Sequence, residues 1–247
     1  MTTRARLTLF GVSVLALAGL LGWAVAGLPA FGEFQGEYGR ILNGVAVHER
    51  HATNVVMAIN FDYRGFDTMG EEFILFAAVM GVALLLREAK DEKTKRPHDD
   101  VRSDGVRAAG LLMVPVTALL GLWLIAHGQL TPGGGFQGGV AAASGLILVY
   151  AAGSYRAYRS AGPLPLVEFA EGTGAGAYVT IGFAALIAGS PFLANILDLG
   201  QTGKVASAGT ITVLSWAVGL EVTAALVLLL QEFLEELAYP TLLGTER

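Results

Sequence analysis

The charged residues that precede one long apolar stretch are the first place where this sequence could do chemistry. Arg64, Asp67, Glu71 and Glu72 lead directly into the uncharged stretch Phe73 to Leu86. Ionisable groups at the depth of a bilayer are costly, and they commonly mark the path of a proton or a cation. On a helix, Asp67 and Glu71 share a face, whereas Glu72 points about 100° away from Glu71. The segment therefore predicts an ion or proton path; the alternative is that its acids only balance the positive end of the helix dipole.

A glycine-rich segment between two apolar stretches is the second candidate site. It consists of His127 and of the motif Pro132, Gly133, Gly134, Gly135, Phe136, Gln137, Gly138 and Gly139. The motif lacks the Gly-Lys-Ser/Thr ending of a phosphate-binding loop. Its glycines at four-residue spacing predict that the following helix packs closely against another helix. His127 could donate a proton to a path, although a histidine at the end of a helix is more often a hydrogen-bonded interface residue.

Glu221 lies near the middle of the last apolar stretch and is the third candidate. A charge at the bilayer centre costs about 3 kcal/mol on insertion scales, so we expect this carboxyl group to be protonated, paired or next to water. The sequence predicts an ion-path or helix-interface role for Glu221. Because about three helical turns separate them, Glu232 should point to the same side as Glu221. Glu232, Glu235 and Glu236 are predicted to be solvated surface residues.

The composition indicates an integral membrane protein. Of the 247 residues, 53% are hydrophobic and 15% are charged, whereas soluble domains carry about 25% charged residues. The absence of cysteine and the four scattered histidines argue against disulfides, thiol catalysis and a zinc enzyme. Six stretches approach the roughly 20 residues that span a bilayer. They are Leu7 to Gly27, Thr68 to Leu86, Ala108 to Ala126, Phe136 to Gly153, Gly174 to Leu193 and Gly209 to Leu230.

The distribution of basic residues predicts that both termini face the cytoplasm. Arg4 and Arg6 precede the first stretch, and a dense basic cluster lies between the second and the third. Basic loops favour the cytoplasmic side of a membrane. The loops on the other side hold only Arg40, Arg50, Arg64 and Lys204. The first stretch is expected to be a retained anchor, because its apolar core is longer than that of a typical signal peptide.

A polar linker predicts two modules. Residues 90–104 are nearly free of apolar side chains and separate a two-helix module, 1–89, from a four-helix module, 105–247. In the external loop of the first module, glycines should break the first half, and the second half, His51 to Tyr63, should form a short interfacial helix rather than a strand. The expected fold is an all-α integral membrane protein with about six transmembrane helices in a two-helix plus four-helix arrangement.

Two motifs resemble parts of the Mrp (Mnh) multisubunit cation/proton antiporter. The segment Arg64-Gly-Phe-Asp-Thr-x-Gly-Glu71 is similar to the small E subunit of the related membrane-bound hydrogenases and to the C-terminal part of the large A subunit. The remainder resembles the MnhB domain of the B subunit. That resemblance is carried by His127-Gly, by Pro132 to Gly139, by Asn195-Ile-Leu-Asp198 and by Trp216-Ala-Val-Gly-Leu-Glu221-Val.

The resemblance implies which acids handle ions. Glu71 matches the membrane glutamate of the family. The resemblance therefore implies that Glu71, rather than the adjacent Glu72, handles the ion. The last helix departs from the family pattern, because Ser215 stands near a position where B subunits carry an aspartate. Either Glu221 substitutes for that acid, or the acid is dispensable in this chain.

The resemblance also implies a function and partners. The chain would be a non-enzymatic subunit of a secondary antiporter that moves Na+ and H+, with no cofactor, no bound metal and no nucleic acid. Its partners would be the A, C, D, E, F and G subunits and the lipid of a prokaryotic plasma membrane. The alternatives are an ion-translocating subunit of a membrane-bound hydrogenase or related redox complex, and a purely structural assembly subunit.

Overall fold

The computed structural model describes residues 3–28, 32, 36–88 and 103–236. By its contacts the chain divides into two compact units, Met1–Ile41 and Leu42–Arg247. The regular secondary structure of the described residues is entirely helical, with nine α-helices and one π-helical turn. This confirms the all-α prediction. The linker predicted at 90–104 falls almost wholly outside the described residues.

The first unit contains one long helix, α1 (Thr3–Ala26). Its stretch Leu7–Ala26 is long and apolar enough to cross a membrane, in agreement with the predicted first span. A second helix, α2 (Glu37–Arg50), begins in this unit and ends in the next. The prediction that glycines break this region was wrong. The burial of Leu42 and Ala46 on one face of α2 offsets the cost of about 1 kcal/mol that a glycine adds to a helix.

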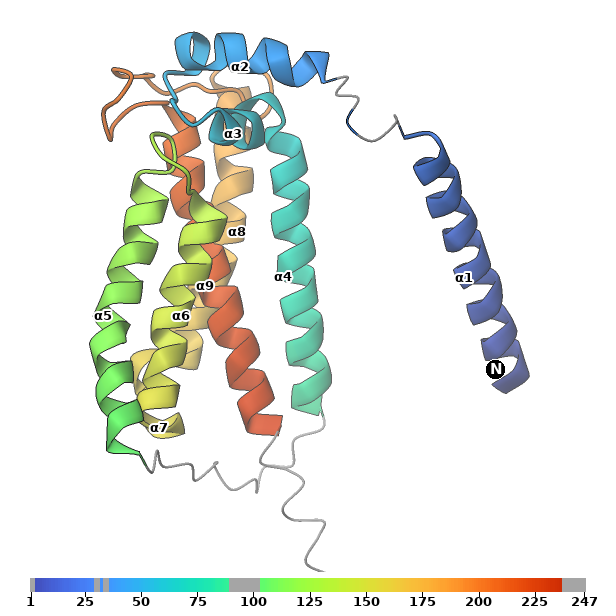
Figure 1. Ribbon diagram of the computed structural model, residues 1–247, viewed down its shortest axis with the longest axis vertical. Coiled ribbons are helices and arrows are strands. Elements are labelled where there is room, and N and C mark those ends of the chain that lie inside the picture. The colour runs from blue at the N-terminus through green and yellow to red at the C-terminus, as the bar shows by residue number, and fades with distance from the viewer. Residues whose placement is uncertain (1–2, 29–31, 33–35, 89–102, 237–247) are drawn as a thin grey trace, which may run out of the picture. The chain divides into compact units, whose positions relative to one another are not determined.

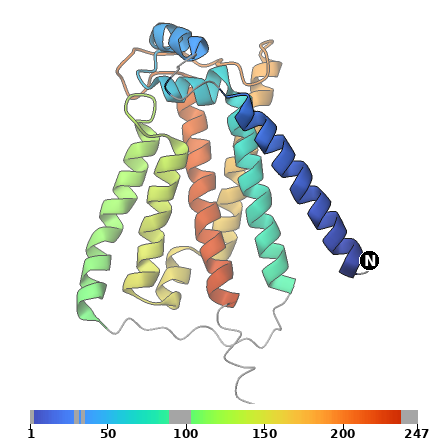
Figure 2. The same cartoon turned by 45° about the vertical axis from the view of Figure 1, so that its right-hand side comes forward.

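The second unit is a bundle in which five long helices run side by side (Figures 1 and 2). They are α4 (Gly65–Glu88), α5 (Asp104–Ala126), α6 (Gly135–Ala152), α8 (Leu164–Ile187) and α9 (Thr210–Glu236). Helix α9 is central, because α4, α6 and α8 all pack against it, whereas α5 packs mainly against α6. The apolar stretch of α9 is accordingly 61% buried inside the chain, compared with 17% for α4.

Short helices lie at the two ends of this bundle. At the end where α4 and α9 begin are α3 (Val55–Ala58) and the π-helical turn η1 (Ile59–Tyr63), and at the other end is α7 (Tyr155–Ala161) (Figure 1). The short helix predicted in the second half of the external loop is confirmed by α3 and η1. It starts at Asn54, whose side chain accepts hydrogen bonds from the first free backbone N–H groups.

Five helices in the described residues are long and apolar enough to cross a membrane, namely α1, α4, α5, α6 and α9. The predicted fifth span, Gly174 to Leu193, corresponds to α8, which begins earlier and ends at Ile187. Helix α8 has 24 residues but is not one of these five, and its first half carries Glu168, Glu171 and two glycines. These residues look like a loop in the sequence, and this is why the span was placed too late.

Small residues bring α6 close to both of its neighbours, as the glycine spacing predicted. A Cβ atom at Gly139 would come within 2.8 Å of Cβ of Val222 on α9. On the other side, a Cβ atom at Gly121 of α5 would come within 2.5 Å of the backbone nitrogen of Ala142. Residues without a side chain are needed at these two crossings.

Candidate ion and proton site

Glu72 of α4 and Glu221 of α9 face each other between two packed helices. The residues are 1% and 0% exposed, and their carboxyl groups lie within hydrogen-bonding distance of each other. Neither carboxyl group accepts a hydrogen bond from a donor elsewhere in the described part of the chain. Two carboxylates repel each other, so this contact is favourable only when one group holds a proton or when a cation lies between them.

The register of α4 places Glu72, and not Glu71, in this interface. The buried positions of α4 repeat at helical spacing and include Thr68, Glu72, Val79 and Ala83. Glu71 lies about 100° around the helix from this stripe, and its side chain is exposed. The hydroxyl group of Thr68 donates a hydrogen bond of 2.8 Å to the carbonyl of Asn60 in η1, which fixes the start of α4.

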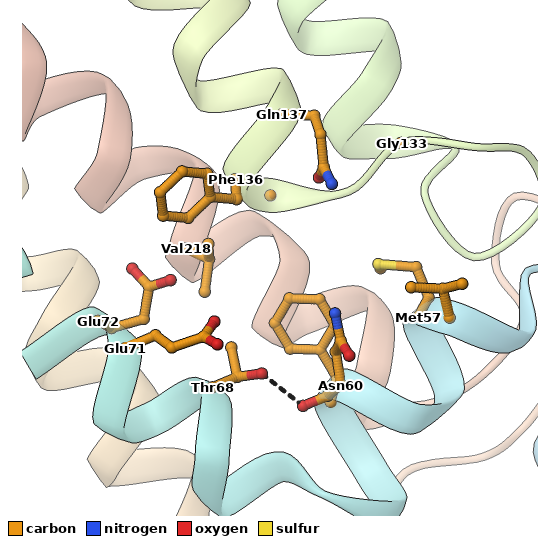
Figure 3. Close-up of a pocket in the computed structure, with 12 residues that line it drawn as sticks. Met57, Asn60, Thr68, Glu71, Glu72, Gly133, Phe136, Gln137 and Val218 are labelled. Carbon is orange, nitrogen blue, oxygen red and sulfur yellow. Dashed lines mark hydrogen bonds between the residues drawn. The ribbon is translucent and has the colours of Figure 1, made fainter. Parts of the chain in front are cut away.

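A cavity of about 200 Å³, lined by Glu71 and Glu72, lies at the end of the bundle where α4 begins (Figure 3). Helix α3, η1 and α4 line one side of it, and the glycine-rich segment and Val218 of α9 line the other. Its polar lining residues are Asn60, Thr68, Glu71, Glu72 and Gln137. A polar cavity of this size has room for several water molecules. It therefore gives water or an ion access to Glu72, the member of the buried carboxyl pair that lines it, from this end.

The glycine-rich segment forms a wall of the cavity through Gly133, Gly135, Phe136 and Gln137. Gly133 and Gly134 have φ values of 156° and 135°, a region that residues with a side chain rarely adopt. Met57 of α3 packs against the segment, and a Cβ atom at Gly134 would come within 2.7 Å of its sulfur. The rest of the predicted motif lies outside the lining: Gly138 packs against Ile125 of α5, Gly139 packs against α9, and Pro132 precedes the wall.

Asn54 holds α3 against this wall. Its Nδ2 atom donates to the carbonyl oxygens of Gly128 at 2.7 Å and Thr131 at 3.0 Å. Its Oδ1 atom accepts from the backbone nitrogens of Val56 at 3.1 Å and Met57 at 3.4 Å. One side chain therefore caps α3 and binds it to the loop that follows α5.

Glu171 of α8 is a third buried carboxyl group, which sequence reasoning missed. It is 1% exposed, and its Oε1 atom has no partner among the described residues. It lies one turn from Gly174, where a Cβ atom would come within 2.7 Å of Cβ of Glu221. The available signal was its spacing of three and four residues from Gly174 and Ala175, because small residues at helical spacing are typical of packed membrane helices.

Arg87 connects the three helices that carry these acids. Its Nη1 atom lies 2.7 Å from Oε1 of Glu168 on α8, and its Nη2 atom lies 2.6 Å from Oε1 of Glu232 on α9. Glu232 is 2% exposed, so its prediction as a solvated residue was wrong. Helix α9 continues to Glu236 and packs against α4. Glu232 lies about three turns after Glu221 on the same side of α9, so this packing buries Glu232 as well. Glu235 is partly buried and accepts a hydrogen bond of 2.6 Å from Tyr155.

Besides Glu221, the predicted site residues Arg64, Asp67 and His127 lie outside the cavity lining. Arg64 and Asp67 form an ion pair with each other, and their side chains are 59% and 50% exposed. His127 stacks on Trp123, with 3.7 Å between the ring centroids. Its Nδ1 atom is buried and has no partner in the described residues.

Three further residues that the sequence singled out have structural contacts. Ser215 is fully buried and donates a hydrogen bond of 3.0 Å to the carbonyl of Ile125. Asn195 donates to Asp62 at 3.1 Å and accepts from the backbone nitrogen of Thr210 at 2.8 Å, so it holds the start of α9. Asp198 accepts a hydrogen bond of 2.9 Å from the backbone nitrogen of Gly200, as expected for a turn.

A bundle of long apolar helices with carboxyl groups buried between them defines a multi-pass membrane protein. Residues 106–228 match the family described as "Domain related to MnhB subunit of Na+/H+ antiporter". The protein MJ1307 of Methanocaldococcus jannaschii is 31% identical over 198 residues, which cover 70% of this chain and 74% of that protein. The chain belongs to the family of membrane proteins that carry this MnhB-related domain, and the resemblance deduced from its motifs is confirmed.

A second relative carries an antiporter name. It is a protein of Rhizobium meliloti, named as a probable K(+)/H(+) antiporter subunit of type A/B, and it is 38% identical over 135 residues. These residues cover 45% of this chain but only 13% of that protein. The chain therefore corresponds to a small part of a much longer protein.

Two solved membrane complexes contain chains of similar fold. A chain of the membrane-bound sulfane sulfur reductase, an archaeal respiratory membrane complex, has a TM-score of 0.71 and 30% identity. The match covers 93% of this chain and 98% of that one. A chain of the Mrp complex from Dietzia sp. DQ12-45-1b has a TM-score of 0.68 at 24% identity, with 94% of this chain and 26% of that chain covered.

Proposed function

We propose that this chain is a non-enzymatic subunit of an Mrp-type cation/proton antiporter complex and that Glu72 and Glu221 lie on its ion path. The observation that carries the proposal is the buried pair of carboxyl groups beside a polar cavity. A cation and a proton compete for the same carboxyl oxygens, so the binding of one releases the other. This competition is the elementary step of an antiporter.

In this proposal α8 is the sixth membrane span. Helices α1 and α4 belong to the two-helix module, and α5, α6, α8 and α9 form the MnhB-like module. The basic loops then lie in the cytoplasm with both termini, and the cavity opens on the external side. Arg64, Asp67, Glu71 and His127 remain predicted contributors to the path.

The proposed partners are the A, C, D, E, F and G subunits of an Mrp-type complex in a prokaryotic plasma membrane. The exposed apolar residues of the bundle support an environment of lipid and neighbouring subunits. On α5 they include Leu112, Leu119 and Trp123, which are 65%, 67% and 53% exposed. Lipid tails or the helices of other subunits would cover such a surface.

A second candidate function is an ion-translocating subunit of a respiratory membrane complex. The likeness to the archaeal sulfane sulfur reductase favours it, because that match covers 98% of the other chain at 30% identity. In that case the same carboxyl pair would move ions when a redox subunit supplies the energy. Cation/proton exchange that proceeds without any redox substrate distinguishes the first function from the second.

The test is ion exchange by the complete complex in everted membrane vesicles. A pH gradient is formed, and the recovery of a pH-sensitive dye after addition of NaCl or KCl reports exchange. Glu221→Gln should lower the exchange rate at least tenfold while the subunits still co-purify. The control is Glu37→Gln, an exposed acid in the first turn of α2, which should exchange normally.

Two results would contradict the ion-path proposal. Normal exchange by the Glu221→Gln complex would show that the carboxyl group is not needed. Loss of co-purification together with loss of exchange would favour the purely structural alternative.

A further inference from the structure

We propose that Arg87 is the barrier that excludes metal cations from the end of the bundle opposite the cavity, so that protons but not Na+ or K+ cross there. This inference rests on the proposed function. It adds a residue and an ion selectivity that the carboxyl pair alone does not define.

Buried acids continue from the cavity toward Arg87. Glu72 faces Glu221, and Glu171 is buried one turn from Gly174, the residue of α8 that packs against Glu221. Glu168 lies one turn before Glu171 on α8 and pairs with Arg87. Acidic side chains from α4, α9 and α8 therefore form a series that begins at the cavity and ends at one guanidinium group.

The guanidinium group of Arg87 occupies the end of this series. Arg87 lies about 22 Å along α4 from Glu72, at a rise of about 1.5 Å per residue. Its Nη1 atom pairs with Glu168 at 2.7 Å, while Nε donates to Oε1 of Glu232 at 2.7 Å. The side chain of Glu232 is only 3% exposed. A metal cation that reached this point would have to displace Arg87 from two acids.

A metal cation and a proton meet different barriers at Arg87. The guanidinium group keeps its charge at any physiological pH, and repulsion between two cations is strong where water is scarce. A proton instead moves by leaving one carboxylic acid and binding to the next carboxylate. Glu171 and Glu168 are three residues apart on one face of α8. Because Glu168 is 38% exposed, it can pass that proton to water while Arg87 stays in place.

The experiment measures passive sodium entry and exchange by the complete complex in proteoliposomes. The first variant is Arg87→Gln. Because it leaves Glu232 buried without its cation, which can destabilise a protein strongly, the second variant combines Arg87→Gln with Glu232→Gln. Arg87→Lys keeps the charge. The control is Arg159→Gln: Arg159 has a similar exposure, 31%, lies at the same end and pairs with Glu235 at 3.7 Å.

Removal of the charge should raise ²²Na+ entry into liposomes without an ion gradient at least tenfold. Arg87→Lys and Arg159→Gln should stay as tight as the unmodified complex. Adding Glu72→Gln to the leaky variant should abolish the leak, because the leak passes through the carboxyl pair.

Three outcomes would overturn the inference or its basis. An assembled complex that lacks the Arg87 charge and still excludes sodium overturns it. Loss of assembly in both charge-removing variants but not in Arg87→Lys overturns it also, since Arg87 would then be only a structural link. If the unmodified complex exchanges no cation for protons, the proposed function fails whatever the Arg87 variants do.

Discussion

The carboxyl groups of Glu72 and Glu221 lie within hydrogen-bonding distance of each other although the residues are on different helices and far apart in the sequence. The contact exists because α9 is the central helix and α4 packs directly against it. Gly174 of α8 closes the third side, since there is no space for a side chain between it and Glu221. The pair therefore lies among α4, α8 and α9, and its Glu72 lines the cavity.

Neighbouring acids on α4 should differ in their effect on exchange. Glu72→Gln should lower the exchange rate at least tenfold, because it removes half of the buried carboxyl pair. Glu71→Gln should lower it only about two- to threefold, because Glu71 lines the cavity but is exposed and acts on ions at a distance. Dye recovery in everted vesicles measures both rates. The opposite order would favour Glu71, the acid that the motif resemblance implies.

Gly174→Ala should destabilise the contact between α8 and α9. The added Cβ atom would come within 2.7 Å of Cβ and of the backbone nitrogen of Glu221, and overpacking of this kind costs about 1–3 kcal/mol. The Tm of the purified complex should fall, and exchange should fall with it. Gly172→Ala and Gly176→Ala are matched controls on the same helix with nothing within 4 Å of the added atom. Equal Tm values for all three variants would contradict the prediction.

Asn54 should contribute to stability in two separable ways. Asn54→Ala removes the cap of α3, worth about 1 kcal/mol, and also two hydrogen bonds to the glycine-rich loop, worth about 1 kcal/mol each. Asn54→Asp keeps an oxygen for the cap but cannot donate to Gly128 and Thr131. Hydrogen exchange at the amides of Val56 and Met57 should therefore be fast in Asn54→Ala and much slower in Asn54→Asp. Fast exchange in both variants would show that the loop contacts, rather than the cap, hold α3.

Tyr63 should titrate at unusually high pH. Burial and the hydrogen bond of 2.6 Å that Tyr63 donates to Glu49 raise its pKa from 10.0 to about 12, although the nearby positive charge of Arg50 opposes the shift. Because the folded pKa lies above the ordinary value, the contact stabilises the fold fully below pH 10 and is lost as the pH rises through about 12. The difference in tyrosinate absorbance between the unmodified protein and Tyr63→Phe should show a transition near pH 12. A transition near the ordinary pKa of tyrosine would contradict the shift.

The membrane helices could be predicted from the sequence because the cost of exposing polar groups to lipid is a local property. Runs of apolar residues near α1, α4, α5, α6 and α9 are long enough to be recognised without knowledge of the fold. Helix α8 was misplaced because its first turns carry Glu168 and Glu171. These acids are compatible with a bundle helix only through Arg87 and the neighbouring buried surface, which local composition does not reveal.

The pairing of the acids could not be predicted, because α4 is apolar on nearly all sides and its sequence does not show which face packs. A turn of about 100° decides whether Glu71 or Glu72 is buried, and contact with α9 selects Glu72. The same holds for Arg87 and Glu232, which are 145 residues apart in the chain. Helical periodicity predicted that Glu232 and Glu221 lie on the same side of α9. It could not show that Arg87 pairs with Glu232.

By itself, the sequence determined the helical membrane class, the MnhB-related domain and the positions of Glu221 and the glycine-rich motif. These properties follow from apolar length, from residue spacing along one helix and from a continuous motif. The tertiary structure decided that Glu72 and Glu221 form a pair and that Glu171 is buried on the helix that packs against Glu221. It also decided that Arg87 pairs with Glu168 and Glu232. Such contacts depend on the packing of α4, α8 and α9 against one another, and packing is a relation between segments that no single segment encodes.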